Sequence, residues 1–289
     1  MKILVSNDDG YKAKGLKVLV ELLLPYGEIT VIAPKYHQSC TSMSVSMGLK
    51  PIAVRELRGE EVPEGCRAAR WFYLDGTPAS CIKYAVDEVF TDGLPDLLVT
   101  GINHGSNAAS AALYSGTLGA AGEGALAGIP SIGFSLDNMG SEADFSEMSK
   151  LFPAVFERLL ANMTDRFGAY YNVNFPDIPA SRIRGLRVCS QGIQHWVREF
   201  RDYDAAVFDR RGTTPKEMGI WGMPEVEPGE KVFLMVGDLT DDPRNTLSAD
   251  HLSLAEGDVT LTVHNIDATD YAEMERLKAG GFETEFKKQ

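Results

Sequence analysis

The chain has only four cysteines among its 289 residues, and it lacks both a long apolar run and an excess of positive charge. The cysteines are widely separated and show no paired metal-ligand spacing; they are Cys40, Cys66, Cys81 and Cys189. This spacing argues against a structural zinc site, and it predicts free thiols in a protein of a reducing compartment.

The sequence contains no apolar run of membrane-spanning length and no signal-peptide pattern after Met1. We therefore expect a cytoplasmic protein with no membrane partner. The 28 Lys and Arg residues are outnumbered by 41 Asp and Glu residues, which gives a net charge of −13. This charge argues against a nucleic acid polymer as partner, because DNA and long RNA bind mainly to clustered cationic side chains. A single nucleotide or a small phosphate ester remains compatible with it.

What the sequence does contain is a regular alternation of strand and helix patterns up to residue 175. Ile3, Leu4 and Val5 form a continuous aliphatic run, which is typical of a strand buried on both faces of a parallel sheet. An amphipathic helix over residues 15–24 and a second strand over residues 28–33 complete a β-α-β unit with a right-handed crossover. The pattern predicts an α/β fold with a mostly parallel sheet. Further strands are expected over residues 71–74, 96–100, 130–135 and 169–175, and further helices over residues 78–89, 114–128 and 145–163.

Two adjacent carboxylates, Asp8 and Asp9, stand where the first predicted strand ends. Ligands of open α/β sheets bind outside the carboxyl ends of the strands, so acidic residues at such an end are placed for chemistry. A hard divalent cation such as Mg²⁺ or Mn²⁺ would relieve their mutual repulsion, because it takes oxygen ligands. The alternative interpretation is that Asp8, Asp9 and Gly10 form only a turn.

Other polar segments are expected near the same edge of the sheet. Residues 101–107 leave the carboxyl end of a buried strand, as Asp8 leaves the first one. The helix predicted over residues 114–128 is rich in small residues, and its first turn should form an anion site from free backbone N–H groups and hydroxyls. Residues 34–50 form a long loop rich in Ser, Thr and Met, which is either functional or a flexible surface segment. The residues at the start of the small-residue helix are Ser115, Gly116 and Thr117.

The pattern changes after residue 190. Residues 191–245 are aromatic, charged and rich in Pro and Gly, which indicates an accessory hairpin region or an interaction arm. A late strand is predicted over residues 258–264, and residues 270–273 have the spacing of a capping box before a charged terminal helix. The chain is therefore predicted to have two parts, residues 1–190 and residues 191–289.

Five motifs, in order and at compatible spacings, resemble the SurE family of stationary-phase survival proteins, which act as metal-dependent 5′/3′-nucleotidases. The match covers most of residues 1–135 and continues more loosely through residues 172–176, 248–250 and 255–257. It implies a Rossmann-like three-layer catalytic domain over residues 1–190 and a C-terminal β-hairpin and helix oligomerisation region with an extended arm over residues 191–289. The motifs are Asn7-Asp8-Asp9-Gly10; Ala33-Pro34 followed by Ser39; Gly76-Thr77-Pro78-Ala79; Pro95-Asp96 through Gly101-Ile102-Asn103-His104-Gly105; and Tyr114-Ser115-Gly116-Thr117-Leu118-Gly119-Ala120.

The resemblance implies that Asp8, Asp9, Ser39 and Asn103 hold one divalent metal ion per subunit, Mg²⁺ or Mn²⁺. All four side chains are hard oxygen donors, in agreement with the inference from the acid pair alone, since a zinc site normally recruits imidazole or thiolate. The assignment of Ser39 rests on the resemblance, because the loop contains many serines.

The reaction implied is hydrolysis of nucleoside 5′-monophosphates to nucleoside and phosphate, with 3′-monophosphates and short polyphosphate as further candidate substrates. The metal would bind a phosphoryl oxygen and activate water. His104 would either donate to the leaving oxygen and orient the phosphate, or be structural. Asp8 or Asp9 as a nucleophile is disfavoured, because both carboxylates are expected to bind the metal. The side chains and backbone expected to cradle the remaining phosphate oxygens are Ser106, Asn107, Ser115, Gly116 and Thr117.

The chain departs from the family pattern near the predicted site. Cys40 replaces the usual Gly, Ser80 replaces the usual acidic residue, and residues 108–112 lack the Gly and Asp that are common there. The expected metal ligands are intact, so these changes bear on substrate preference and rate. They keep open the alternative of a nucleotide-binding regulatory protein with little turnover. A further alternative is an oligomeric scaffold that acts mainly through residues 191–245.

The resemblance also implies a homodimer or homotetramer built by exchange of the arm. The arm has no helical or strand period able to bury its aromatic residues, and its arginines match the composition of interface cores and rims. The alternative is a local flap over the active site. The residues concerned are Trp196, Phe200, Tyr203, Phe208 and Trp221, beside Arg198, Arg201, Arg210 and Arg211.

Overall fold

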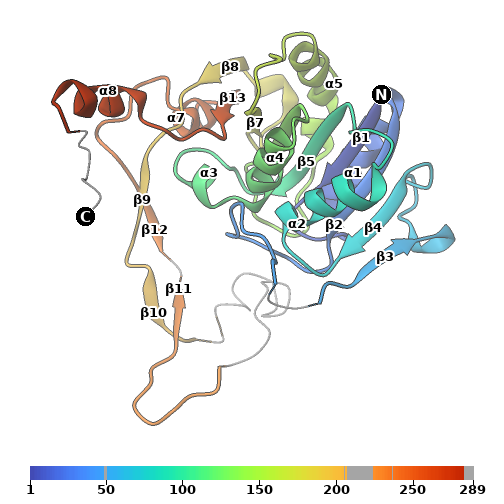
Figure 1. The fold of residues 1–289 in the computed structure, drawn as a ribbon, viewed down its shortest axis with the longest axis horizontal. Helices are drawn as coiled ribbons and strands as arrows, with labels where there is room; N and C mark the ends of the chain where they lie inside the picture. Colours follow the sequence, from blue (N-terminus) through green and yellow to red (C-terminus); the bar gives the residue numbers. More distant parts are fainter. Residues whose placement is uncertain (49–50, 205, 207–223, 236, 283–289) are drawn as a thin grey trace, which may run out of the picture.

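The computed structural model describes residues 1–48, 51–204, 206, 224–235 and 237–282, and its main feature is a nine-stranded sheet (Figure 1). The strand order is β3-β4-β2-β1-β5-β6-β7-β13-β8. Strands β4 to β7 in this order are parallel, whereas β3 is antiparallel to β4 and β13 is antiparallel to β7. The predicted mostly parallel sheet is confirmed. The strands are β1 Lys2–Ser6, β2 Glu28–Pro34, β3 Val54–Leu57, β4 Arg70–Leu74, β5 Leu97–His104, β6 Ser131–Leu136, β7 Ala169–Phe175, β8 Gly185–Cys189 and β13 Asp258–Asn265.

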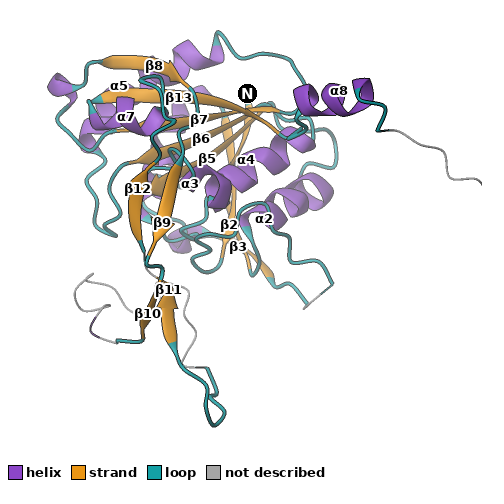
Figure 2. Cartoon of the chain, turned by 90° about the vertical axis from the view of Figure 1, so that its left-hand side faces the viewer, coloured by secondary structure: helices purple, strands orange, loops and turns teal. Residues whose placement is uncertain are grey.

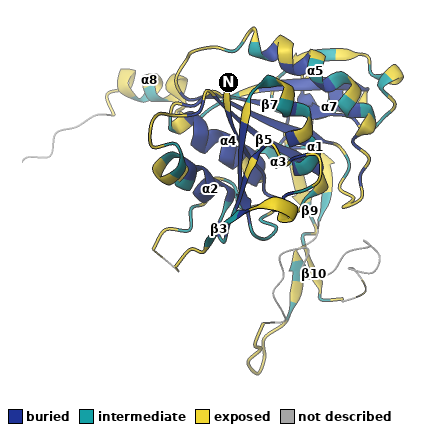
Figure 3. Ribbon diagram, turned by 90° about the vertical axis from the view of Figure 1, so that its right-hand side faces the viewer, coloured by how far each residue is buried: buried dark blue, intermediate teal, exposed yellow. Residues whose placement is uncertain are grey.

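Helices cover both faces of the sheet and make a three-layer fold, as predicted. Ile3 and Val5 of β1 are buried in the cluster that contains α1 and α5, whereas Leu4 is buried in the cluster that contains α2 and α4. The alternation explains why the first strand has three consecutive apolar residues, Ile3 to Val5. Figure 3 shows the central strands buried between the two helix layers. The α-helices among the described residues are α1 Lys14–Leu23, α2 Pro78–Tyr84, α3 Ala111–Tyr114, α4 Gly116–Leu126, α5 Ser146–Leu160, α7 Asp250–Ala255 and α8 Tyr271–Ala279.

Two helices begin at the capping residues that the sequence predicts. Thr77 caps α2 by accepting a hydrogen bond from the Ser80 N–H, and Asp270 caps α8 by accepting one from the Glu273 N–H at 3.0 Å. The helix predicted over residues 114–128 is divided in the structure. Ser115 ends α3 and caps α4, so the small-residue helix begins at Gly116.

A narrow arm projects from the body of the molecule (Figure 2). It consists of β9 Gln194–Val197 paired with β12 Asp238–Asp241, and of β10 Phe200–Asp202 paired with β11 Phe233–Met235. Both pairings are antiparallel, so the predicted hairpin is confirmed. Residues 49–50 and four residues predicted for the arm interface lie outside the described residues; the four are Phe208, Arg210, Arg211 and Trp221.

The chain returns from the arm to the main sheet. Strand β13 lies between β7 and β8, and α7 packs against β13. The boundary at residue 190 remains a prediction about folding units, since β13 from beyond it completes the sheet of the first part. Within the described residues, no helix is long and apolar enough to cross a membrane.

Candidate metal and phosphate site

The predicted site lies at the carboxyl ends of three neighbouring strands. Strand β1 is flanked by β2 and β5 in the sheet, so the segments that follow these strands meet at one edge. They carry Asp8 and Asp9 after β1, Ser39 after β2, and Asn103 near the end of β5. The register between β5 and β6 shifts between Thr100 and Asn103. Such an irregularity re-aims the side chains that follow it.

Asp8 is the most constrained acid of the site, with only 4% of its surface exposed. The Thr117 hydroxyl donates to Asp8 Oδ1 at 2.6 Å and lies 3.5 Å from Asn103 Oδ1. Burial, and then the charge of Asp9, raise the pKa of Asp8 to about 6, although the hydrogen bonds from Thr117 and the charge of His37 oppose this shift. The charged form of Asp8 is therefore unfavourable in the folded protein, and a bound cation would stabilise it.

Asp9 is held through both of its carboxylate oxygens. The backbone N–H of His104 donates to Oδ2 at 3.2 Å, and Nδ1 of His37 lies 3.4 Å from Oδ1. The other ring nitrogen of His37, Nε2, lies 2.6 Å from Ser39 Oγ. Burial alone would lower the pKa of His37, but its contacts with Asp9 and the charge of Asp8 raise the pKa above its usual value. His37 thus connects two of the predicted metal ligands.

The N-terminal end of α4 approaches Asp8 closely. A Cβ atom at Gly116 would lie 2.8 Å from both Asp8 Cβ and Thr41 Oγ1, so only glycine allows this approach. The Ser115 hydroxyl oxygen accepts from the Leu118 N–H at 3.0 Å, which makes it a helix cap. The structure therefore brings Ser115, Gly116 and Thr117 to the acid pair, with the side chains of the two hydroxyl residues already hydrogen-bonded within the protein.

Asn103 and His104 have different environments although they are adjacent. Asn103 Nδ2 donates to the Gly105 carbonyl at 2.7 Å, which directs Oδ1 toward Thr117 as an available oxygen ligand. The His104 ring accepts from the Gly15 N–H at Nε2 (3.3 Å), so Nδ1 carries the hydrogen and donates to the Gly140 carbonyl at 2.8 Å. Both ring nitrogens of His104 are therefore used in contacts with the backbone.

Asn107 belongs to a buried hydrogen-bond network below the site. Its N–H donates to Asn174 Oδ1 at 2.7 Å, and its Nδ2 donates to Ser135 Oγ at 3.0 Å. Asn172 Nδ2 donates to the Asn107 carbonyl at 2.8 Å. Ser106 precedes it and is half-buried. These contacts anchor the loop, whereas contact of Ser106 and Asn107 with phosphate remains a prediction.

The residues present fit a hard divalent cation. In the described part of the chain, no Lys or Arg pairs with Asp8 or Asp9, and His37 is the basic side chain that contacts this acid pair. No group of three His, Cys, Asp or Glu side chains within that part could hold a metal. The donors at hand are instead two carboxylates, the Asn103 amide oxygen and the Ser39 hydroxyl, which suit Mg²⁺ or Mn²⁺ better than zinc.

Residues that the sequence pattern did not single out complete the site. His37 bridges Asp9 and Ser39, and the signal available was its position two residues before Ser39 in the same loop. Asn172 and Asn174 lie in a segment that matched the family loosely, and their alternate spacing on β7 places both amides on one face. The side-chain directions became visible only in the folded chain.

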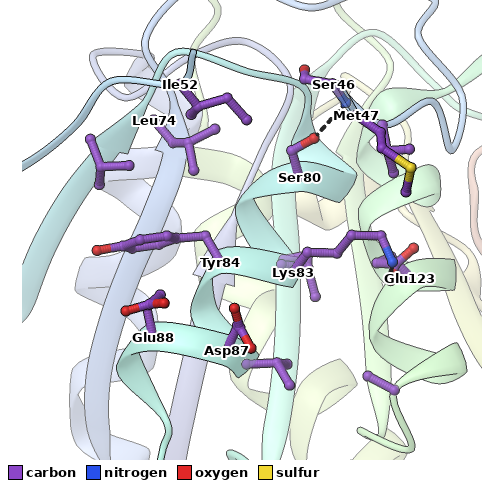
Figure 4. Close-up of a pocket in the computed structure, with 15 residues that line it drawn as sticks. Ser46, Met47, Ile52, Leu74, Ser80, Lys83, Tyr84, Asp87, Glu88 and Glu123 are labelled. Carbon is purple, nitrogen blue, oxygen red and sulfur yellow. Dashed lines mark hydrogen bonds and ion pairs between the residues drawn. The ribbon is translucent and has the colours of Figure 1, made fainter. Parts of the chain in front are cut away.

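A separate cavity of about 710 Å³ lies between α2, α4 and β3 (Figure 4). Ser80, which replaces the usual acidic residue of the family, lies at this cavity and accepts from the Ser46 N–H at 2.9 Å. Lys83 and Glu123 form an ion pair of 2.6 Å on its wall. The described lining contains none of the predicted site residues, so the Ser80 change alters this cavity and the loop above it, not the acid pair.

Fold and site together define an α/β protein with an acidic, oxygen-donor site at the carboxyl edge of a mostly parallel sheet. Residues 3–198 match the family model of survival protein SurE, so the chain belongs to the SurE family, as its five motifs predict.

Individual relatives agree with this assignment. The chain is 35% identical to the 5′-nucleotidase SurE of Bacteroides thetaiotaomicron over 288 residues, which cover 98% of this chain and 97% of the relative. It is 47% identical to the 5′-nucleotidase SurE of Myxococcus xanthus over 135 residues, which cover 47% of each chain. The crystal structure of the SurE protein from Aquifex aeolicus is similar with a TM-score of 0.73 and 26% identity, covering 97% of this chain and 100% of that one.

Proposed function

We propose that this protein is a 5′-nucleotidase that hydrolyses nucleoside 5′-monophosphates to nucleoside and phosphate with one divalent metal ion per subunit. The observation that carries the proposal is the convergence of Asp8 and Asn103 on Thr117 at the N-terminal end of α4, with Asp9 held next to them by the His104 N–H. The relatives named 5′-nucleotidase SurE support the same reaction. Activity toward 3′-monophosphates and short polyphosphate is part of the proposal.

Asp8, Asp9, Ser39 and Asn103 would hold the metal. A bound Mg²⁺ or Mn²⁺ would stabilise negative charge on phosphoryl oxygens and activate water. The protein's own residues supply the arrangement: Thr117 fixes Asp8, and the backbone N–H of His104 fixes Asp9. The first turn of α4 would add N–H groups and helix dipole to the phosphate site.

For His104 we propose a positioning role. Its ring joins the end of β5 to α1 and to Gly140, and it packs edge-on against Phe145 with ring centroids 5.1 Å apart. A ring fixed on both nitrogens is poorly placed to exchange a proton with a leaving oxygen, because donation would break a contact with the backbone. Its backbone N–H, in contrast, points at the Asp9 carboxylate.

A substrate panel tests the proposed function. Phosphate release is measured for purine and pyrimidine 5′- and 3′-monophosphates and for short polyphosphate, with Mg²⁺, Mn²⁺ or chelator. We expect metal-dependent release from 5′-monophosphates, and we expect Asp9→Asn to abolish it without unfolding the protein. Binding of nucleotide without release at saturating Mn²⁺ would instead favour the regulatory alternative, and full activity of Asp9→Asn would exclude the assigned site.

We further propose a cytoplasmic homodimer or homotetramer that binds no nucleic acid polymer. Unpaired thiols at all four cysteines support a reducing compartment, and the net charge of −13 disfavours polyanions.

The arm supports the oligomer, because Phe200, Phe233 and Met235 are respectively 70%, 44% and 68% exposed in the single chain. Apolar side chains gathered on a narrow hairpin gain burial when a second copy covers them.

A further inference from the structure

His37 occupies a position between two predicted metal ligands. It lies in the loop after β2, with Nδ1 3.4 Å from Asp9 Oδ1 and Nε2 2.6 Å from Ser39 Oγ. The five family motifs do not include this residue. Its contacts therefore describe a feature of this chain that the family resemblance leaves unassigned.

The hydrogen positions follow from the chemistry of the partners. A carboxylate only accepts hydrogen bonds, so Nδ1 of His37 must carry the hydrogen that faces Asp9. Nε2 and the Ser39 hydroxyl share a hydrogen bond of 2.6 Å, in which the ring donates when it is protonated and accepts when it is neutral. In either case Ser39 Oγ keeps a lone pair for a cation, and Asp9 keeps a free lone pair on each oxygen.

The loop backbone has independent anchors. The Gln38 N–H donates to the Asp8 carbonyl at 2.7 Å, and the Thr41 hydroxyl donates to the Gln38 carbonyl at 2.8 Å. Removal of the His37 ring should therefore free Asp9 Oδ1 and the Ser39 hydroxyl without releasing the loop, while Asp9 Oδ2 keeps its contact with the His104 N–H. Ser39 is exposed and would then rotate among its χ1 rotamers.

We propose that His37 is a positioning residue that orients Asp9 and Ser39 and thereby sets the affinity of the site for Mg²⁺ or Mn²⁺. The inference rests on the proposed metal site and adds a residue that determines how tightly this site binds the metal ion. Residues that orient metal ligands in this way typically change metal affinity by about 10- to 100-fold when they are removed.

Binding of Mn²⁺ alone, measured by electron paramagnetic resonance titration, tests the proposal without reference to activity. The proteins compared are the wild type, His37→Ala, His37→Gln and the loop control Gln38→Ala. We expect His37→Ala to bind Mn²⁺ about 10- to 100-fold more weakly. His37→Gln should be intermediate, because an amide can replace one of the two contacts. Gln38→Ala should bind as the wild type does, because Gln38 is engaged here through its backbone.

The outcomes separate the inference from the proposed function. Equal affinities of the wild type and His37→Ala, with unchanged circular dichroism, would overturn the inference alone. A wild-type protein that fails to bind Mn²⁺ would overturn both. A phosphorylated Ser39, trapped by acid quench during turnover and identified by mass spectrometry, would also overturn the inference, because the hydroxyl would then be a nucleophile activated as in serine hydrolases.

Discussion

At the scale of the residue, the buried carboxylate of Asp8 lowers the stability of the folded protein and at the same time provides a binding site. Its carboxylate is buried beside Asp9, and the hydrogen bonds from Thr117 only partly offset the cost of burying the charge. Folding alone would favour a neutral side chain at this position. The carboxylate is useful only if a cation stabilises it, so the local destabilisation is itself a sign of a ligand site.

We predict that Asp8→Asn raises the free energy of unfolding of the metal-free protein by about 3 kcal/mol at neutral pH and abolishes phosphatase activity. Asp8 takes up its proton at about pH 6 in the folded state and near its ordinary pKa of 3.8 in the unfolded state. Between these values the folded state holds more protons, so wild-type stability should rise as pH falls through this window. The advantage of the Asn variant should be full above about pH 6 and vanish below about pH 4.

Urea denaturation of both chelator-treated proteins across this pH range measures the difference. The low-pH end of the series is the internal control, since Asp8 is then neutral in both states. Equal stability of the two proteins at neutral pH would contradict the prediction.

At the scale of the element, the small residues of α4 let its backbone lie close to neighbouring segments. Its glycines let the helix lie against the loop after β2 and against Asp8, so the small residues serve contacts and not helix propensity. Different glycines face different neighbours. A Cβ at Gly119 would lie 1.9 Å from the Ser42 carbonyl oxygen, whereas one at Gly122 would lie 3.0 Å from the flexible Met43 Sδ.

These neighbours predict opposite results for the same substitution on one helix. Gly119→Ala should destabilise the protein by about 1–3 kcal/mol and reduce activity, because the backbone of the loop must move away from the site. Gly122→Ala should be neutral or stabilising by up to about 1 kcal/mol, because alanine favours the helix and the Met43 side chain can adjust. Thermal unfolding and phosphate release of the two variants form a matched pair. An equal loss of stability and activity in the two variants would show that the effect comes from helix packing in general and not from the contact with Ser42.

At the scale of the whole molecule, Asp250 joins the site loop to the root of the arm. Its buried Oδ1 accepts from the N–H groups of Ala109 at 2.9 Å, Gly192 at 3.0 Å and His251 at 2.8 Å. Ser110 adds a second link, since its hydroxyl accepts from the Gln194 N–H at 3.0 Å. The arm and the loop over residues 105–110 are thus parts of one hydrogen-bonded unit.

We predict that Asp250→Ala destabilises the protein by about 3 kcal/mol or more, because several buried N–H groups lose their acceptor together. Amide hydrogen exchange should increase at both Ala109 and Gly192. The exposed Asp177→Ala is a suitable control, with exchange unchanged at these two positions. Faster exchange at only one of them would show that Asp250 does not couple the two segments.

The proposed oligomer is tested by shortening the arm. Val197 and Asp238 are paired residues of β9 and β12, so a two-residue turn can replace residues 198–237 and keep the root intact. We expect smaller particles by light scattering with unchanged substrate affinity at each site. An unchanged mass with altered affinity would favour a flap over the active site. Leu247→Ser is a control, because Leu247 is 91% exposed outside the arm.

The sequence alone determined the order of the parallel strands and of the main helices that connect them, the acid pair at the end of β1 and the small-residue helix that approaches it. These features depend on local periodicity and on the rule that ligand sites gather at the carboxyl ends of parallel strands, so a chain without a known structure reveals them. The family motifs added Ser39 and Asn103, which periodicity alone cannot distinguish from other polar loop residues.

Only the tertiary structure decided how the side chains are used. The His104 ring is directed to Gly15 and Gly140, His37 reaches both Asp9 and Ser39, and β13 enters the main sheet after the arm. Each of these results depends on segments distant in sequence and on the rotamer adopted where they meet. A repeating pattern records which face of an element is apolar, but it contains no information about which polar atom a given side chain will contact.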